Sequence, residues 1–167
     1  MNYIIRKKKR EDCAAVAHVA TISWNETYKE IVPDLFLKGL YDNEEERAQN
    51  SYDKFDINDN NTLVLEVDGE VVGFSKYGKS NNTNYDNCGE IFALYIIGKY
   101  HGYGYGRKLV EEAINELKKL GFDKMVIACL KGNPTNEFYK HIGGVYVKDG
   151  MYERLQLPEN IYYYEKI

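Results

Sequence analysis

Three glycines alternate with two tyrosines in HGYGYG, the run from His101 to Gly106. An apolar stretch precedes this run and a segment with helical apolar spacing follows it, so we predict a strand, a turn and a helix. The first amides of a helix are unpaired and partly positive, and glycine lets the main chain approach an anion closely. The junction therefore suits a phosphate or pyrophosphate, and a tight turn without a ligand is a nearly equal alternative.

Two common phosphate-binding motifs do not fit these letters. A P-loop needs G-x-x-x-x-G-K-[ST], whereas Gly106 is followed by Arg107 and Lys108. A dinucleotide fingerprint needs G-x-G-x-x-G, whereas the residue three positions after Gly104 is Arg107. The missing P-loop lysine disfavours an ATP-using enzyme.

Glu90 is the only acid in the apolar run CGEIFALYII. Acids are seldom found inside apolar strands. The carboxylate could remove a proton from a substrate amine, directly or through a water molecule. A glutamate that simply reaches water at the start of a strand is an equally good interpretation.

Apolar periodicity and turn residues predict the elements that position these groups. Asp68-Gly69 between two β-prone runs is a strong hairpin signal. Gly121 is expected to end the helix after the glycine run, and Asn133 and Pro134 to begin the next helix. We predict strands at 3–5, 62–67, 70–78, 88–97, 124–129, 145–150 and 159–167, and helices at 10–28, after Pro33, at 43–55, 109–120 and 133–143.

The composition, with 44% hydrophobic and 29% charged residues, is that of an ordinary globular protein. A net charge of -4 argues against nucleic acid as the main partner, and we interpret the basic run Arg6–Arg10 as a solvated turn. No apolar run approaches the ~20 residues of a membrane span, and no secretory signal is evident. We expect a cytoplasmic protein that binds neither nucleic acid nor membrane. The cysteines, Cys13, Cys88 and Cys129, are scattered and favour buried free thiols over disulfides or a metal site.

With its neighbouring segments included, the glycine run resembles the GCN5-related N-acetyltransferase (GNAT) superfamily. The acetyl-coenzyme A signature of that family is [QR]-x-x-G-x-[GA], and the last four positions of the window fit, with His101 where glutamine or arginine is usual. The segment EIFALYIIGKYHGYGYGRKLVEEAI resembles the family's central strand, pyrophosphate loop and helix, and NPTNEFYKHIGG resembles its next motif. The N-terminal HVATISWNETYKEIVPDLFL is similar to the opening helices of small bacterial members.

The resemblance implies one α/β (α+β) domain over residues 1–167. Its fold would be a mixed, mostly antiparallel twisted sheet flanked by helices, with a splayed central strand pair. Acetyl-coenzyme A would be the co-substrate, with no metal. The implied cofactor-binding residues are Leu94, Tyr95, Ile96, His101, Gly102, Tyr103, Gly104, Tyr105, Gly106, Arg107, Asn133 and Asn136, although Asn133 is equally well explained as a helix cap.

Acetyl transfer to an amine needs a base for the amine and an acid for the departing thiolate. Glu90 is the candidate base. The resemblance implies that Tyr139 protonates the thiolate, with Phe138 facing the core; a packed aromatic ring is the alternative for Tyr139. A phenol is chemically suited to this role because its pKa near 10 is close to that of a thiol.

The resemblance further implies that Trp24 and Tyr28 line the entry of the amine, with Glu26 and Glu30 as further candidates; a core position is the alternative for Trp24. We therefore predict an enzyme that acetylates a primary amine of a small molecule (polyamine, amino acid or aminoglycoside) or a peptide, by direct transfer in a ternary complex. A sensor that binds acyl-coenzyme A without turnover is the alternative. A homodimer is compatible with either function.

Overall fold

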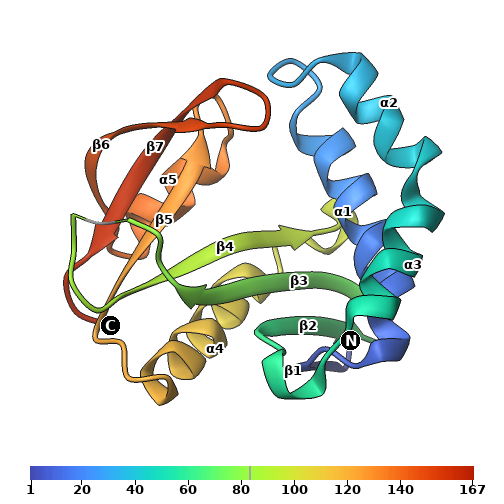
Figure 1. Ribbon diagram of the computed structural model, residues 1–167, viewed down its shortest axis with the longest axis horizontal. Helices are drawn as coiled ribbons and strands as arrows, with labels where there is room; N and C mark the ends of the chain where they lie inside the picture. Colours follow the sequence, from blue (N-terminus) through green and yellow to red (C-terminus); the bar gives the residue numbers. More distant parts are fainter. Residues whose placement is uncertain (83) are drawn as a thin grey trace. The chain divides into compact units, whose positions relative to one another are not determined.

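The computed structural model describes residues 1–82 and 84–167 (Figure 1). The chain divides into two compact units, and each is described by itself. The first unit comprises Met1–Lys76 and Ala93–Glu112, and the second comprises Tyr77–Phe92 and Ala113–Ile167. None of the helices in the described part of the chain is both long and apolar enough to cross a membrane.

Three helices belong to the first unit: α1 (Cys13–Thr27), α2 (Asp34–Asp42) and α3 (Glu44–Lys54). Helix α1 buries Val16 and Val19 in a core cluster with strand residues Val64 and Phe74. The guanidinium of Arg47 in α3 donates to the main-chain oxygen of Leu40 in α2 at 2.7 Å and to the hydroxyl of Thr21 in α1 at 2.6 Å. A partly buried hydrogen-bond network around Arg47 therefore connects the three helices.

A hairpin forms the strand layer of the first unit. It joins β2 (Thr62–Val67) to β3 (Glu70–Lys79), and β1 (Tyr3–Lys7) pairs with β2 in antiparallel register. The two turn residues both have positive φ, 48° at Asp68 and 87° at Gly69, which is the turn that matches the twist of a two-residue hairpin. The predicted hairpin is confirmed.

The second unit is built on β5 (Lys124–Leu130), β6 (Val145–Tyr152) and β7 (Leu157–Tyr164), with α5 (Thr135–His141) between β5 and β6 in the chain. Strand β7 pairs antiparallel with both β5 and β6. Strand β4 (Cys88–Ile96) pairs with β5 in parallel only through its first three residues. The strand order of the sheet is β1-β2-β3-β4-β5-β7-β6, which confirms the predicted mixed, mostly antiparallel sheet.

Helix α4 (Tyr105–Lys119) follows β4 and the short 3-10 turn η3 (Gly98–Tyr100). Leu109, Val110, Ala113 and Leu117 of its apolar face are buried, whereas Leu120 is exposed, and Gly121 follows the helix with φ 95°. The helix begins earlier than its apolar pattern suggested, inside the glycine run. Other boundaries differ by a few residues: α5 begins at Thr135, after Asn133 and Pro134, and β7 begins at Leu157.

Candidate active site

The glycine run forms a tight turn that ends in the first residue of α4. Gly102 has φ 85° and Gly104 has φ 80°, conformations that side chains with a Cβ rarely adopt. The main-chain nitrogen of Lys108 donates to the oxygen of Gly104 at 3.2 Å, and the helical amides before Lys108 have no intrahelical acceptor. The predicted strand, turn and helix are confirmed, and the first amides of a helix that follows such a turn are of the kind that bind anions.

The ring of His101 supports this turn from within the same unit. Its Nε2 lies 2.7 Å from the main-chain oxygen of Ile96, at the end of β4. Because a carbonyl oxygen can only accept, Nε2 carries the proton in this hydrogen bond. This hydrogen bond therefore connects the turn to β4, the strand that precedes it.

The two tyrosines of the glycine run have different environments. Tyr105 is buried among Leu65, Val67 and Val72, whereas Tyr103 is 56% exposed. The two rings stack with their centroids 5.8 Å apart. Tyr105 thus anchors the start of α4 in the core, and Tyr103 leaves an accessible ring face beside the turn.

Glu90 lies in the second unit, in the part of β4 that pairs with β5. The hydroxyl of Ser80 donates to its Oε1 at 2.7 Å. Burial raises the pKa of Glu90 above the usual glutamate value, and the hydrogen bond from Ser80 opposes part of that rise. A half-buried carboxylate with a raised pKa is suited to take up a proton.

A second carboxylate and the Ser80 hydroxyl were not found by sequence reasoning. Glu159 of β7 pairs in register with Leu130, and its pKa is raised first by burial and then by the negative charge of Glu90. No motif marks either residue in the sequence: Ser80 bonds Glu90 across ten positions of the chain, and Glu159 depends on the pairing of β7 with β5. Across residues 1–82 and 84–167, no group of three or more His, Cys, Asp or Glu side chains is arranged to hold a metal ion.

Tyr139 is buried in α5, with 5% of its surface exposed, whereas Phe138 is half-buried. This corrects the expectation that Phe138 is the core-facing residue of the pair. The ring of Tyr139 lies 6.3 Å from that of Tyr162, and its main-chain oxygen accepts a hydrogen bond from the hydroxyl of Tyr164 at 2.8 Å. Helix α5 is thereby fixed to β7.

Asn136 has a structural role in the second unit. Its amide nitrogen donates to the main-chain oxygens of Leu130 and Asn133, at 2.9 and 2.8 Å. Its amide oxygen accepts from Asn160 at 3.0 Å and from the hydroxyl of Tyr162 at 2.7 Å. These four bonds use both donors and both acceptor positions of the amide, so a cofactor would have to displace one of them.

The predicted N-cap is off by one residue: Pro134 is the N-cap of α5, and Asn133 precedes it and acts on the first helical amide. Its Oδ1 accepts a hydrogen bond from the main-chain nitrogen of Thr135 at 2.9 Å. This bond satisfies one of the free amides at the beginning of the helix.

Replacing Asn136 by alanine is expected to lower the free energy of unfolding by about 2–4 kcal/mol, because several buried groups lose their partners at once. Urea denaturation monitored by circular dichroism measures the change. Asn160→Ala removes only one of the four bonds and serves as the control. An equal loss in the two variants would contradict the central role of Asn136.

The candidate acceptor-binding residues belong to an aromatic cluster in the first unit. The Trp24 ring lies 4.6 Å from Tyr28, 5.7 Å from Phe36 and 6.0 Å from Tyr95. Tyr28 is buried, which agrees with a core role, and Trp24 is half-buried. The cluster connects the end of α1 to Tyr95, one of the implied cofactor-binding residues of β4.

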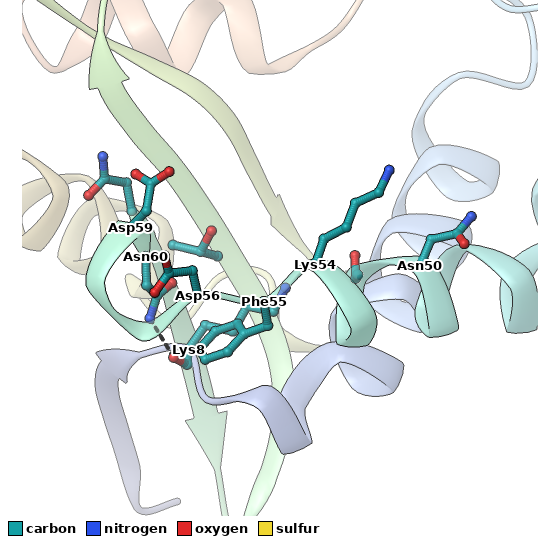
Figure 2. Close-up of a pocket in the computed structure, with 10 residues that line it drawn as sticks. Lys8, Asn50, Lys54, Phe55, Asp56, Asp59 and Asn60 are labelled. Carbon is teal, nitrogen blue, oxygen red and sulfur yellow. Dashed lines mark hydrogen bonds between the residues drawn. The ribbon is translucent and has the colours of Figure 1, made fainter.

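A separate polar pocket of about 300 Å³ lies in the first unit (Figure 2). Its lining includes Lys8 and Lys54 together with Asp56 and Asp59, and no predicted site residue is among its lining residues. The mixed charges favour neither an anion nor a cation. We therefore assign it no part in the chemistry of the candidate site.

Known proteins of similar sequence match most of the chain. A sequence model of the acetyltransferase (GNAT) family matches residues 24–144. The uncharacterized N-acetyltransferase YuaI of Bacillus subtilis (strain 168) is 30% identical over 138 residues, which cover 81% of this chain and 76% of that protein.

Solved structures share the fold. The PaiA N-acetyltransferase from Thermoplasma acidophilum, in complex with coenzyme A, has a TM-score of 0.73 at 22% identity and covers 98% of this chain and 100% of its own. A GCN5-related N-acetyltransferase from Rhodopseudomonas palustris has a TM-score of 0.74 at 17% identity. The match covers 100% of this chain and 97% of that protein. YncA from Salmonella typhimurium, with its cofactor acetyl-CoA, has a TM-score of 0.68 at 19% identity. The match covers 97% of this chain and 92% of that protein.

Proposed function

Because the chain belongs to the acetyltransferase (GNAT) family, we propose that it transfers an acetyl group from acetyl-coenzyme A to the primary amine of a small molecule or a peptide. The glycine turn carries this proposal. Gly102 and Gly104 have positive φ directly before α4, within the residues matched to the family. Such a turn binds a pyrophosphate through main-chain amides and needs no lysine, and coenzyme A contains a pyrophosphate.

The proposed cofactor site uses mostly main-chain groups. The amides and carbonyls of Leu94, Tyr95 and Ile96 hold the pantetheine arm as a neighbouring strand would. The turn from His101 to Arg107 holds the pyrophosphate. The exposed ring of Tyr103 is available to cover the nucleotide, and two structural neighbours were crystallised with coenzyme A or acetyl-CoA, which supports this assignment.

The proposed reaction is a direct transfer in a ternary complex. The amine nitrogen attacks the thioester carbonyl carbon, the carbon–sulfur bond breaks, and coenzyme A leaves as the thiolate. Glu90 accepts the proton that the amine loses, and Tyr139 donates a proton to the thiolate. Holding the two reactants together supplies an effective molarity of about 10⁵ M or more, which is the largest contribution.

The acceptor is proposed to enter along the end of α1. The half-buried ring of Trp24 presents aromatic surface there, and the buried ring of Tyr28 packs against it with the centroids 4.6 Å apart. Aromatic faces attract cations, so an amine that enters protonated is favoured. The ammonium releases its first proton to water before attack, and Glu90 accepts the second proton as the carbon–nitrogen bond forms.

Two measurements test the proposed function. Titration calorimetry with acetyl-coenzyme A and with ATP identifies the cofactor. A thiol-release assay then follows turnover with polyamines, amino acids, aminoglycosides and peptide N-termini. We expect acetyl-coenzyme A to bind and at least one amine to release thiol. Binding with no release across the panel would support the sensor alternative, and binding of ATP but not acetyl-coenzyme A would overturn both.

Gly104→Ala is expected to weaken acetyl-coenzyme A binding about tenfold, since holding a Cβ residue at this left-handed φ costs roughly 1–2 kcal/mol and shifts the turn. Calorimetric Kd values measure the effect. Gly39→Ala, in the middle of α2 with open space around the added Cβ, is the matched control and should leave Kd unchanged. Equal Kd values for the two variants would show that the turn is not part of the cofactor-binding site.

A further inference from the structure

Glu26 and Gly98 are far apart in the sequence but joined by a hydrogen bond within the first unit. The main-chain nitrogen of Gly98 donates to Oε1 of Glu26 at 3.1 Å. Glu26 lies in the last turn of α1, and Gly98 is the first residue of η3, the turn that leads from β4 toward the glycine turn. A Cβ added to Gly98 would overlap the Glu26 carboxylate, so the two groups are in close contact.

The segment 97–101 depends on a few hydrogen bonds for its position. The nitrogen of Ile97 donates to the main-chain oxygen of Val72 at 3.0 Å, and the nitrogen of His101 donates to the oxygen of Gly98 at 2.9 Å. The first amides of a helical turn have no acceptor inside that turn. Gly98 therefore needs an acceptor from elsewhere in the chain, and Glu26 supplies it.

We infer that Glu26 is a positioning residue for the cofactor: its carboxylate holds Gly98, and Gly98 in turn fixes the segment that enters the glycine turn. The inference rests on the proposed function, because it takes acetyl-coenzyme A as the ligand of that turn. Glu26 acts through main-chain groups and touches neither reactant.

The position of Glu26 links the acceptor side of the first unit to the cofactor turn. The same end of α1 carries Trp24, whose ring lies 6.0 Å from Tyr95 of β4. A displacement of this helix end would therefore move the acceptor-binding aromatics and the support of the turn together. Cofactor affinity is expected to respond to changes at this helix end.

A competing role for Glu26 is attraction of a cationic amine, as the family resemblance suggests. The two roles differ in what they require of the side chain. Positioning needs an oxygen that accepts the Gly98 hydrogen bond, whereas attraction needs a negative charge. Glu26→Gln keeps the oxygen and removes the charge, so it separates the two roles.

The experiment measures Kd for acetyl-coenzyme A by calorimetry in four variants. Glu26→Ala and Gly98→Ala are each expected to raise Kd about 3–10-fold, the usual effect of losing one partly exposed hydrogen bond to a charged group. Glu26→Gln is expected to bind as the wild type does. Glu45→Ala, which removes an exposed charge from α3, is the control and should also leave Kd unchanged.

Steady-state kinetics add a readout that a merely structural role would not move. We expect the KM for acetyl-coenzyme A to rise in Glu26→Ala while kcat stays close to the wild-type value, with rescue of KM in Glu26→Gln. The double variant Glu26→Ala/Gly98→Ala should have a Kd for acetyl-coenzyme A no higher than that of the single variant with the higher Kd, because both changes break the same contact.

Two outcomes overturn the inference: wild-type Kd in Glu26→Ala, or a Kd in Glu26→Gln as high as in Glu26→Ala. Thermal melting followed by circular dichroism checks that each variant is folded, and Gly98→Ala tests the contact from its other side. A wild-type protein that fails to bind acetyl-coenzyme A would contradict the proposed function instead, so the two failures are distinguishable.

Discussion

Replacing Glu90 by glutamine is expected to lower kcat by about 10²–10⁴-fold, the usual contribution of a general base. The amide keeps the size of the side chain and an oxygen that accepts the Ser80 hydrogen bond, which measures 2.7 Å in the wild type. It cannot take a proton from the amine. Steady-state thiol release measures the loss, and calorimetry should show unchanged binding of acetyl-coenzyme A.

The pH profile gives a second readout for Glu90. The base acts only when deprotonated, and burial raises its pKa. In the wild type, kcat should therefore rise with pH through a pKa above the usual glutamate value. This rising limb of the pH profile should be absent in Glu90→Gln. Ser80→Ala removes a hydrogen bond that lowers the pKa, so it should shift the limb to higher pH.

The effect of Glu90 on stability has the opposite sign to its effect on rate. Its pKa is raised in the folded protein, so its contribution to stability is present below the ordinary glutamate pKa and is lost as pH rises through the raised pKa. At neutral pH, Glu90→Gln should be at least as stable as the wild type. A variant that keeps the wild-type kcat would show that water, and not Glu90, takes the proton.

Tyr139→Phe is expected to lower kcat by roughly 10²-fold, because the departing thiolate loses its proton donor. The change keeps the buried ring, and the hydrogen bond from Tyr164 reaches the main chain of residue 139, which phenylalanine also provides. The KM for acetyl-coenzyme A should stay near its wild-type value.

Tyr162→Phe is the matched control for Tyr139→Phe. Tyr162 is also buried, and its hydroxyl bonds Asn136 at 2.7 Å, so its loss should lower stability and leave kcat nearly unchanged. If Tyr139→Phe loses activity only in proportion to its unfolded fraction, as measured by circular dichroism, Tyr139 is a packing residue and not the acid.

Features set by adjacent residues could be predicted from the sequence. The positive φ values of Asp68 and Gly69 follow from residue types that tolerate them, and the hairpin forms where those residues stand. Gly121 ends α4 for the same reason. The glycine turn is also local, because its conformation depends on Gly102 and Gly104 and on the helix that starts directly after them.

Features that depend on distant pairings could not be predicted in this way. The influence of Glu90 on Glu159 requires β7 to follow β5 in the sheet, an order that no local pattern encodes. The full use of the Asn136 amide likewise depends on β7, which supplies Asn160 and Tyr162. The bond between Glu26 and Gly98 joins residues 72 positions apart.

The buried cysteines matter for a protein proposed to release coenzyme A at every turnover. Burial raises the pKa of Cys88 to about 11 and that of Cys129 to about 12, so both stay protonated near neutral pH. Mixed disulfides form only when a thiolate attacks a disulfide sulfur. Cys88 and Cys129 are therefore protected from coupling to oxidised coenzyme A, and accumulation of that by-product should leave them unmodified.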